Sequence, residues 1–210
     1  IQGMLMDSQD IVRQLSDYRY NPGVRGIILR IDSPGGAVAP AQEIYNEIMK
    51  LRADHKTVYA SMGTVAASGG YYIACAADYV LANPGTLTGS IAAVMAFSNV
   101  EELTNKIGVK PVVIKSGKYK DVGSPMRTMK PEEQKLLQNV VDDVHQQFVQ
   151  AVAKGRGLPV SQVSEIADGR IMTGQQALKL KLIDEVGGLE KTIDLLAKKI
   201  GIVGKPKVIE

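Results

Sequence analysis

The sequence predicts an α/β fold built on a parallel sheet, and two patterns indicate it. Apolar runs of strand length alternate with segments whose apolar residues recur every three to four positions, as in amphipathic helices. Glycine-rich turns at 32–36 and 68–70 follow two of the strand-like runs, at the place where open α/β sheets bind their ligands. Strands that alternate with helices are typical of a parallel sheet with right-handed crossovers.

The first half of the chain contains two strand-to-helix units. Each has a strand-length apolar run, a turn rich in small residues, and a helical pattern. One further helix precedes these units and a third strand follows them. The predicted elements are a helix at 8–18, strands at 26–31, 57–62 and 78–82, and helices after the turns at 32–36 and 68–70.

The second half is predicted to contain more helix. A helix at 100–108 and a strand at 111–114 precede a polar, glycine-containing segment at 115–125. A long amphipathic helix then starts at Pro131, followed by short strands and helices. A helix of about five or six turns is long enough to extend beyond a compact core and contact another subunit. Its apolar stripe consists of Leu136, Leu137, Val140, Val141, Val144, Phe148 and Val152.

The composition is that of an ordinary globular protein. Of the 210 residues, 45% are hydrophobic and 22% charged, and the formal net charge of +3 is too small to indicate nucleic-acid binding. No apolar run approaches the roughly 20 residues needed to span a bilayer. The chain begins at Ile1 without an initiator methionine, so we expect a trimmed chain that has lost an anchor or targeting segment. We expect one domain over residues 1–210, with the helical part at about 130–210 as an oligomerisation region.

Ser68 is the candidate nucleophile. It follows a strand-like segment and precedes an apolar helical pattern, and its neighbours Ala67, Gly69 and Gly70 are small. Small neighbours leave room for a substrate backbone and let a backbone N–H approach a developing oxyanion. A structural interpretation stays open beside this one, since small residues also allow a helix start to pack tightly against another element.

A serine needs a base before it can attack a carbonyl carbon. In a Ser-His-Asp arrangement the base would be His55, in a polar turn, or His145, in the middle of the long helix. In a Ser-Lys pair it would be a neutral, desolvated lysine, and Lys118 and Lys120 lie in the irregular segment after a predicted strand. Alternate residues of an extended segment point the same way, so geometry alone does not choose between these lysines, and surface charge is the competing interpretation for both.

Metal chemistry has few candidate residues. With only two histidines and no Cys/His spacing of a metal site, we expect no metal and no cofactor. The single cysteine, Cys75, lies in an apolar helical run, where we expect a buried, structural side chain. No internal disulfide can form.

Five motifs are spread over nearly the whole chain. They are Asp32-Ser33-Pro34-Gly35-Gly36, Ala66-Ala67-Ser68-Gly69-Gly70-Tyr71-Tyr72, Thr88-Gly89-Ser90-Ile91, Lys115-Ser116-Gly117-Lys118-Tyr119-Lys120-Asp121, and Asp168-Gly169-Arg170 through Glu185. In this order they closely resemble the signal peptide peptidases of serine peptidase family S49, found in bacteria and archaea. Each motif alone is weak, whereas the five together are specific.

The resemblance implies a ClpP/crotonase-type fold of repeated ββα units and a Ser-Lys dyad. Ser68 matches the nucleophile, and Lys120, 52 residues downstream, matches the general base. Ser90 matches the position whose hydroxyl hydrogen-bonds the lysine amine and helps to hold it. Gly35 and Gly69 match the two backbone N–H donors of the oxyanion hole.

The resemblance also implies a function and a location. Family members are endopeptidases that degrade remnant signal peptides left in the membrane after their release from preproteins. They are ring- or dome-shaped homo-oligomers in the cell membrane, with a single-pass anchor and an extracytoplasmic catalytic domain. That anchor would precede the start of this chain. Half-length members, to which this chain corresponds, form each active site from neighbouring protomers.

Two other functions stay open on the same fold. A crotonase-type CoA thioester hydratase or isomerase also uses paired backbone amides, but it would need an acidic residue where Ser68 stands. A non-catalytic scaffold subunit would need none of Ser68, Ser90 and Lys120, and all three are present. Labelling with a fluorophosphonate probe would separate these functions from that of a serine peptidase.

Overall fold

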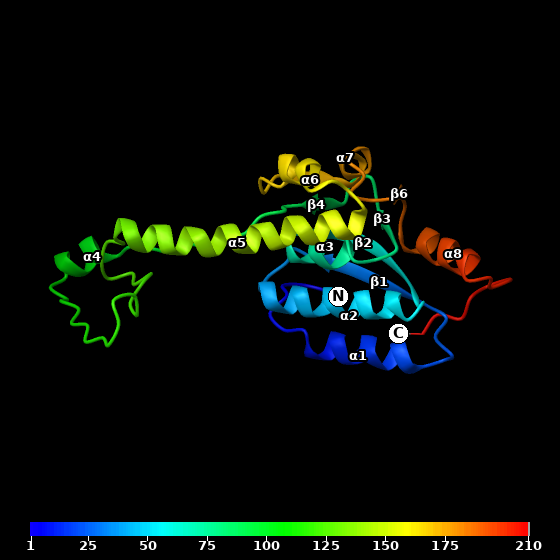
Figure 1. The fold of residues 1–210 in the computed structure, drawn as a ribbon, viewed down its shortest axis with the longest axis horizontal. Coiled ribbons are helices and arrows are strands. Elements are labelled where there is room, and N and C mark those ends of the chain that lie inside the picture. The colour runs from blue at the N-terminus through cyan, green and yellow to red at the C-terminus, as the bar shows by residue number, and fades with distance from the viewer. Residues whose placement is uncertain (210) are drawn as a thin grey trace. The chain divides into compact units, whose positions relative to one another are not determined.

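The computed structural model describes residues 1–209 of the chain. Strands and helices alternate in its first half, and helices dominate its second half (Figure 1). The elements are α1 (Gln9–Tyr20), β1 (Gly26–Ser33), α2 (Val38–Ala53), β2 (Thr57–Ala67), α3 (Gly69–Ala74), β3 (Tyr79–Ala82), β4 (Leu87–Gly89), α4 (Glu101–Lys106), α5 (Pro131–Arg156), α6 (Val160–Ile166), β5 (Ile171–Thr173), α7 (Gly174–Lys179), β6 (Glu185–Val186) and α8 (Leu189–Lys199).

Six strands of the described chain form one sheet, and β2 is its main strand. β2 pairs in parallel with β1, β3 and β4, and β3 pairs in parallel with β6. Among the described strands, only β4 and β5 pair antiparallel. The helices α2 and α3 each lead from one parallel strand to the next, which is the crossover connection that a parallel sheet requires. The predicted α/β fold is therefore confirmed.

The described residues divide into two compact units. The first consists of residues 1–92 and 147–209 and contains the sheet, and the second consists of residues 93–146. Both segments of the first unit contribute to its larger buried core, which includes Tyr71 and Phe148. The single-domain organisation and the role of residues 130–210 in assembly stay predictions.

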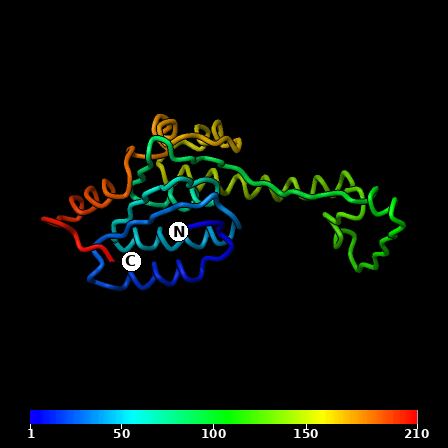
Figure 2. Tube along the Cα trace, turned by 180° about the vertical axis from the view of Figure 1, so that it is seen from behind, coloured from blue at the N-terminus to red at the C-terminus, as the bar shows by residue number. Residues whose placement is uncertain are grey.

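The N-terminal segment pairs with the turn that follows β1. Leu5 N–H donates to the Gly35 carbonyl at 2.9 Å, and Ala37 N–H donates to the Leu5 carbonyl at 2.7 Å. Closer to the terminus, Gly3 N–H donates to the Asp32 carbonyl at 3.0 Å. The trace of this segment, in dark blue, runs beside the end of β1 (Figure 2). These hydrogen bonds fix the glycine turn from its outer side.

Two predicted elements differ from the structure. Residues 111–114 form no strand, and Val112 and Ile114 are 87% and 97% exposed. A strand is stable only when its backbone groups find a neighbour, and the described chain brings no strand beside this run. The helix α5 begins at the predicted proline, but of its predicted stripe only Phe148 and Val152 are buried.

Candidate active site

Ser68 stands at the sharp turn between β2 and α3. Its backbone has φ 52° and ψ −122°, a left-handed conformation that residues other than glycine rarely adopt. The turn is fixed from both sides, because Ser68 N–H donates to the Gly89 carbonyl and Tyr72 N–H donates to the Ser68 carbonyl, each at 2.9 Å. A half-buried serine in a strained strand-to-helix turn has the geometry of a nucleophile elbow.

The glycines after Ser68 let this turn pack directly on the turn that follows β1. A Cβ on Gly70 would lie 2.6 Å from the Ser33 carbonyl oxygen, and a Cβ on Gly69 would lie 3.3 Å from Gly35 Cα. The first distance is impossible for a real side chain, so only glycine fits at position 70. The two turns thus pack tightly, as the structural interpretation of the small residues expects, and this packing is compatible with a nucleophile at the same turn.

The two predicted oxyanion donors lie together beside Ser68. Gly35 has φ +98°, and a Cβ there would lie 2.6 Å from Gly69 N and 2.9 Å from Ser68 Cβ. The Gly69 N–H begins α3 and donates to no acceptor among the described residues. The Gly35 N–H, in contrast, donates to Ser33 Oγ at 3.1 Å. An oxyanion would find the Gly69 donor free and would share the Gly35 donor with a hydroxyl.

Ser33 was not singled out from the sequence, although a signal for it exists. A serine hydroxyl that accepts the N–H two residues later is a common local turn, and the order Ser-Pro-Gly places Gly35 at that distance. The Ser33 side chain is fully buried. Its hydroxyl therefore orients the Gly35 amide without competing water.

Ser90 occupies the equivalent place at the end of the neighbouring strand. β2 and β4 pair with Ala67 opposite Gly89, so Ser68 and Ser90 each follow one member of this pair at the carboxyl end of the sheet. Ser90 has φ 51°, and its N–H donates to the Arg170 carbonyl at 2.8 Å. Both predicted serines are among the four non-glycine residues with positive φ in the described chain. Backbone strain at two adjacent strand ends is typical of a functional site.

Lys120 belongs to the second unit, whereas the other four predicted site residues belong to the first. Its segment was expected to be extended, but this expectation is wrong, because the segment forms consecutive turns. Lys120 N–H donates to the Gly117 carbonyl at 3.2 Å and Val122 N–H to the Tyr119 carbonyl at 3.1 Å. Gly123, with φ +78°, follows in a conformation that glycine favours. The expected alternation of the two lysines therefore does not apply.

The surroundings of the two lysines differ. Lys118 Nζ lies 5.0 Å from the centre of the Tyr119 ring and 3.6 Å from the Glu132 carboxylate. The Tyr119 side chain first, and then Glu132, raise the pKa of Lys118. A lysine whose ammonium form is stabilised is a poor base. The exposed Lys120 ammonium has no hydrogen bond or ion pair with any described residue.

Neither His55 nor His145 has the surroundings of a catalytic base. His55 lies exposed in the turn after α2 with φ 61°. His145 lies on α5 in the second unit, and its buried Nε2 has no hydrogen-bond partner among the described residues. The exposed His55 and the unpartnered Nε2 of His145 lack the surroundings that the base of a Ser-His-Asp arrangement requires. Cys75 is buried as predicted, and burial raises the pKa of its thiol to about 12.

Residues 1–209 contain neither a cluster of metal ligands nor a helix that could span a membrane. No three His, Cys, Asp or Glu side chains of this range are placed to hold a metal ion. None of its helices combines the length and the apolar composition needed to cross a membrane. The helix α5 has sufficient length, with 26 residues, but charged residues recur along it.

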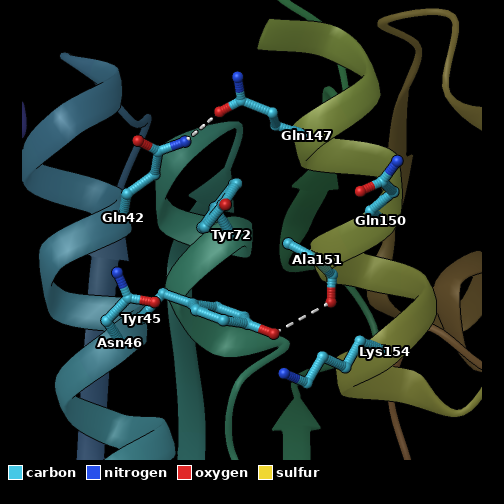
Figure 3. A pocket seen from close by; sticks show the side chains of 8 residues that line it. All are labelled: Gln42, Tyr45, Asn46, Tyr72, Gln147, Gln150, Ala151 and Lys154. Carbon is cyan, nitrogen blue, oxygen red and sulfur yellow. Dashed lines mark hydrogen bonds between the residues drawn. The ribbon is translucent and has the colours of Figure 1, made fainter. Parts of the chain in front are cut away.

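A groove of about 380 Å³ lies between α2, α3 and the C-terminal part of α5 (Figure 3). On its rim, Gln42 Nε2 donates to Gln147 Oε1 at 2.8 Å, and the Tyr45 hydroxyl donates to the Ala151 carbonyl at 3.5 Å. The Tyr72 ring packs edge-on against the Tyr45 ring, with centroids 5.2 Å apart. None of the predicted site residues lines this groove. Its contacts tie α2 to α5 around α3, the helix that begins at the Ser68 turn.

Comparison with known families also indicates a peptidase, in agreement with the geometry of the Ser68 turn. Residues 50–202 match the family model of Peptidase family S49. The chain belongs to this family. Residues 5–88 also match the Clp protease family, which confirms the predicted ClpP-type fold. The S49 match includes Ser68, Ser90 and Lys120, and the Clp match includes the turn with Gly35.

Three relatives agree with the S49 assignment. A Synechocystis sp. protein, provisionally named a protease, is 49% identical over 176 residues, which are 84% of this chain and 63% of that protein. The chloroplastic serine protease SPPA of Arabidopsis thaliana is 39% identical over 207 residues, 98% of this chain and 30% of that protein. An Enterococcus faecium protein, provisionally named signal peptide peptidase SppA, is 37% identical over 191 residues, 91% of this chain and 56% of that protein. The chain thus spans less than two thirds of each of these relatives.

Proposed function

We propose that this S49 chain is the catalytic part of a serine endopeptidase that uses a Ser-Lys dyad. Ser68 is the nucleophile and Lys120 the general base. The observation that carries the proposal is the strained Ser68 turn, which lies at the carboxyl end of the sheet beside the free N–H of Gly69. In a non-catalytic scaffold, a strained serine next to an unpaired amide donor would cost stability and serve no chemistry.

The residues divide the chemistry among them. The neutral Lys120 amine takes the proton of the Ser68 hydroxyl as its oxygen attacks the peptide carbonyl carbon. The N–H groups of Gly69 and Gly35 stabilise the oxyanion that forms. The Lys120 ammonium then protonates the leaving amine, and the same amine activates the water that hydrolyses the acyl-enzyme. The Ser90 hydroxyl accepts a hydrogen bond from the amine and orients it.

The dyad forms between neighbouring subunits of a closed homo-oligomer, with a ring or dome shape. Two observations support this assembly. Lys120 belongs to a compact unit other than that of Ser68. That second unit also exposes several large apolar side chains, a feature of interaction surfaces. They include Val94, Leu103, Ile107, Val112, Val113, Ile114 and Val140, which are 43% to 97% exposed.

The substrates we propose are remnant signal peptides released from preproteins. The support comes from the S49 family match and from the E. faecium relative, whose provisional name is that of a signal peptide peptidase. Such peptides are apolar and stay in the membrane, so the enzyme would act there through an anchor outside the sequence. Its catalytic part would face the extracytoplasmic side.

A mixing experiment tests both the dyad and its location. Ser68→Ala and Lys120→Ala variants are each expected to be inactive on a synthetic apolar signal peptide, whereas subunit exchange between them restores some activity. Exchange is verified independently with two fluorescent labels, one on each variant. Verified exchange without any activity would place the dyad within one subunit. Normal turnover by the Ser68→Ala variant would refute the assignment of Ser68 as the nucleophile and with it the proposed dyad.

A further inference from the structure

Arg127 joins two carboxylates of the second unit. Its Nε donates to Asp121 Oδ2 at 2.9 Å, and its Nη1 and Nη2 donate to the two carboxylate oxygens of Glu133 at 2.7 and 2.6 Å. The paired contact to Glu133 uses the planar fork of a guanidinium, which lysine lacks. Glu133 lies in the first turn of α5. Arg127 therefore connects the residue after Lys120 to the start of a long helix.

The same cluster holds the main chain on both sides of Lys120. Arg127 Nη2 also donates to the Asp121 carbonyl at 3.2 Å. The Lys115 ammonium donates to the Lys118 carbonyl at 3.0 Å and pairs with the Asp121 carboxylate. The backbone is thus fixed two residues before Lys120 and one residue after it. The Lys120 side chain itself stays exposed.

The cluster differs from an ordinary surface ion pair. Exposed pairs contribute little because water competes for their charges, whereas the side chains of Asp121 and Glu133 are only 12% and 2% exposed. The Arg127 guanidinium lowers the pKa of Glu133 to about 2 and, with Lys115, holds the pKa of Asp121 well below its usual range. Both carboxylates therefore stay charged at neutral pH.

The ion pairs of Asp121 also matter for the adjacent Lys120. A free carboxylate next to a lysine stabilises the ammonium form, and an ammonium cannot accept a proton. Two cations, Lys115 and Arg127, bind the Asp121 carboxylate instead. The Asp121 carboxylate is therefore bound by these two cations and not by Lys120.

We propose that Arg127 is a positioning residue, which holds the turn that presents Lys120 to the nucleophile by binding Asp121 and Glu133. The inference rests on the proposed role of Lys120 as the base. A base must lie within hydrogen-bond distance of the proton that it takes, and a displacement of about 1 Å can cost about 100-fold in rate. A lysine on an irregular turn needs such an anchor, since no strand or helix supports it.

The test compares Arg127→Ala and Arg127→Lys with the unchanged protein. Steady-state hydrolysis of a fluorogenic apolar peptide should show kcat reduced by about 10- to 100-fold for Arg127→Ala, with KM changed less than about twofold. Arg127→Lys keeps the charge but lacks the planar fork, so its kcat should lie between that of Arg127→Ala and that of the unchanged protein. Guanidinium ion at tens of millimolar should restore part of the kcat of Arg127→Ala only. Arg13→Ala, which removes an exposed pair with Asp10, is the matched control.

A second variant guards against misfolding. Arg127→Ala leaves the buried Glu133 carboxylate without its ion-pair partner, which can be strongly destabilising, although the Lys130 N–H still donates to it. The double variant Arg127→Ala/Glu133→Gln removes both charges and should fold, as judged by circular dichroism and an unchanged oligomer size. It should still have a low kcat, because Asp121 has lost its link to α5.

The outcomes separate this inference from the proposed function. A folded variant without Arg127 that keeps the kcat of the unchanged protein overturns the positioning role. So does a loss of activity that guanidinium does not reverse and that follows the loss of the oligomer. If Lys120→Ala keeps full activity, the base assignment itself fails. If Lys120→Ala is inactive and Arg127→Ala is fully active, the proposed dyad is supported and only the positioning role of Arg127 is refuted.

Discussion

Replacing Gly35 by alanine is expected to damage both the fold and the site. The backbone at Gly35 has φ +98°, which costs an L side chain about 1–2 kcal/mol. The new methyl group would stand 2.6 Å from Gly69 N and 2.9 Å from Ser68 Cβ. The backbone must shift to relieve such contacts, at a typical cost of about 1–3 kcal/mol. We therefore expect the free energy of unfolding to fall by about 2–5 kcal/mol, a large share of the stability of most domains.

Two other glycines separate these contributions. Gly3 has φ +73° but would place a Cβ in open space, so Gly3→Ala carries the backbone cost alone. Gly85 also faces open space, and its φ lies outside the left-handed range. Gly85→Ala is therefore expected to be neutral, or to stabilise the fold by up to about 1 kcal/mol, because it restricts the unfolded chain.

Urea unfolding followed by circular dichroism measures the three variants under one condition. The expected order of stability is Gly85→Ala, then Gly3→Ala, and Gly35→Ala last. Labelling of native Ser68 by a fluorophosphonate should also slow in Gly35→Ala, because the methyl group sits against the Gly69 amide. A Gly35→Ala variant as stable as Gly3→Ala would refute the close packing of the two turns, and with it the geometry of the oxyanion site.

Three further predictions address the dyad, the thiol and the ion cluster. Lys120→Ala should lose activity by at least about 10²–10⁴-fold at every pH, whereas Lys118→Ala should keep most of it in the same peptide assay. The Cys75 thiol should not react with a thiol reagent at pH 8 until urea unfolds the protein, because its pKa is raised to about 12. The pKa of Glu133 falls from 4.5 to about 2 on folding. The contribution of Glu133 to stability is therefore complete above pH 4.5 and is lost as the pH falls through 2. Acid unfolding of Glu133→Gln beside the unchanged protein checks this prediction.

The strand-to-helix turns could be predicted from the sequence because their causes are local. Strand-length apolar runs that end in small residues fix both β1 and β2 and the turns after them. The glycines at 35 and 70 are required by contacts between these two turns, and the motif order already placed both turns at the same end of a parallel sheet.

The predictions that fell short depend on contacts between distant residues. An apolar run at 111–114 predicts a strand, but a strand also needs a neighbour, which local pattern does not supply. The cluster of Arg127 with Asp121 and Glu133 spans six residues in each direction. Because no regular element has that spacing, only the turns of the intervening loop bring the charges together.

The two units hold the proposed site residues by different means. Around Ser68 and Ser90, sheet hydrogen bonds and buried glycine contacts hold two strained serines, and strain of this kind persists only where the surroundings over-determine it. Around Lys120 no sheet is present, and an ion cluster fixes the backbone instead. Each unit thus pre-organises its own groups, so that under the proposed mechanism assembly has only to bring two prepared surfaces together. Pre-organisation lowers the cost of forming the transition state, and under the proposed mechanism it would let two subunits share a dyad without losing the geometry that the chemistry needs.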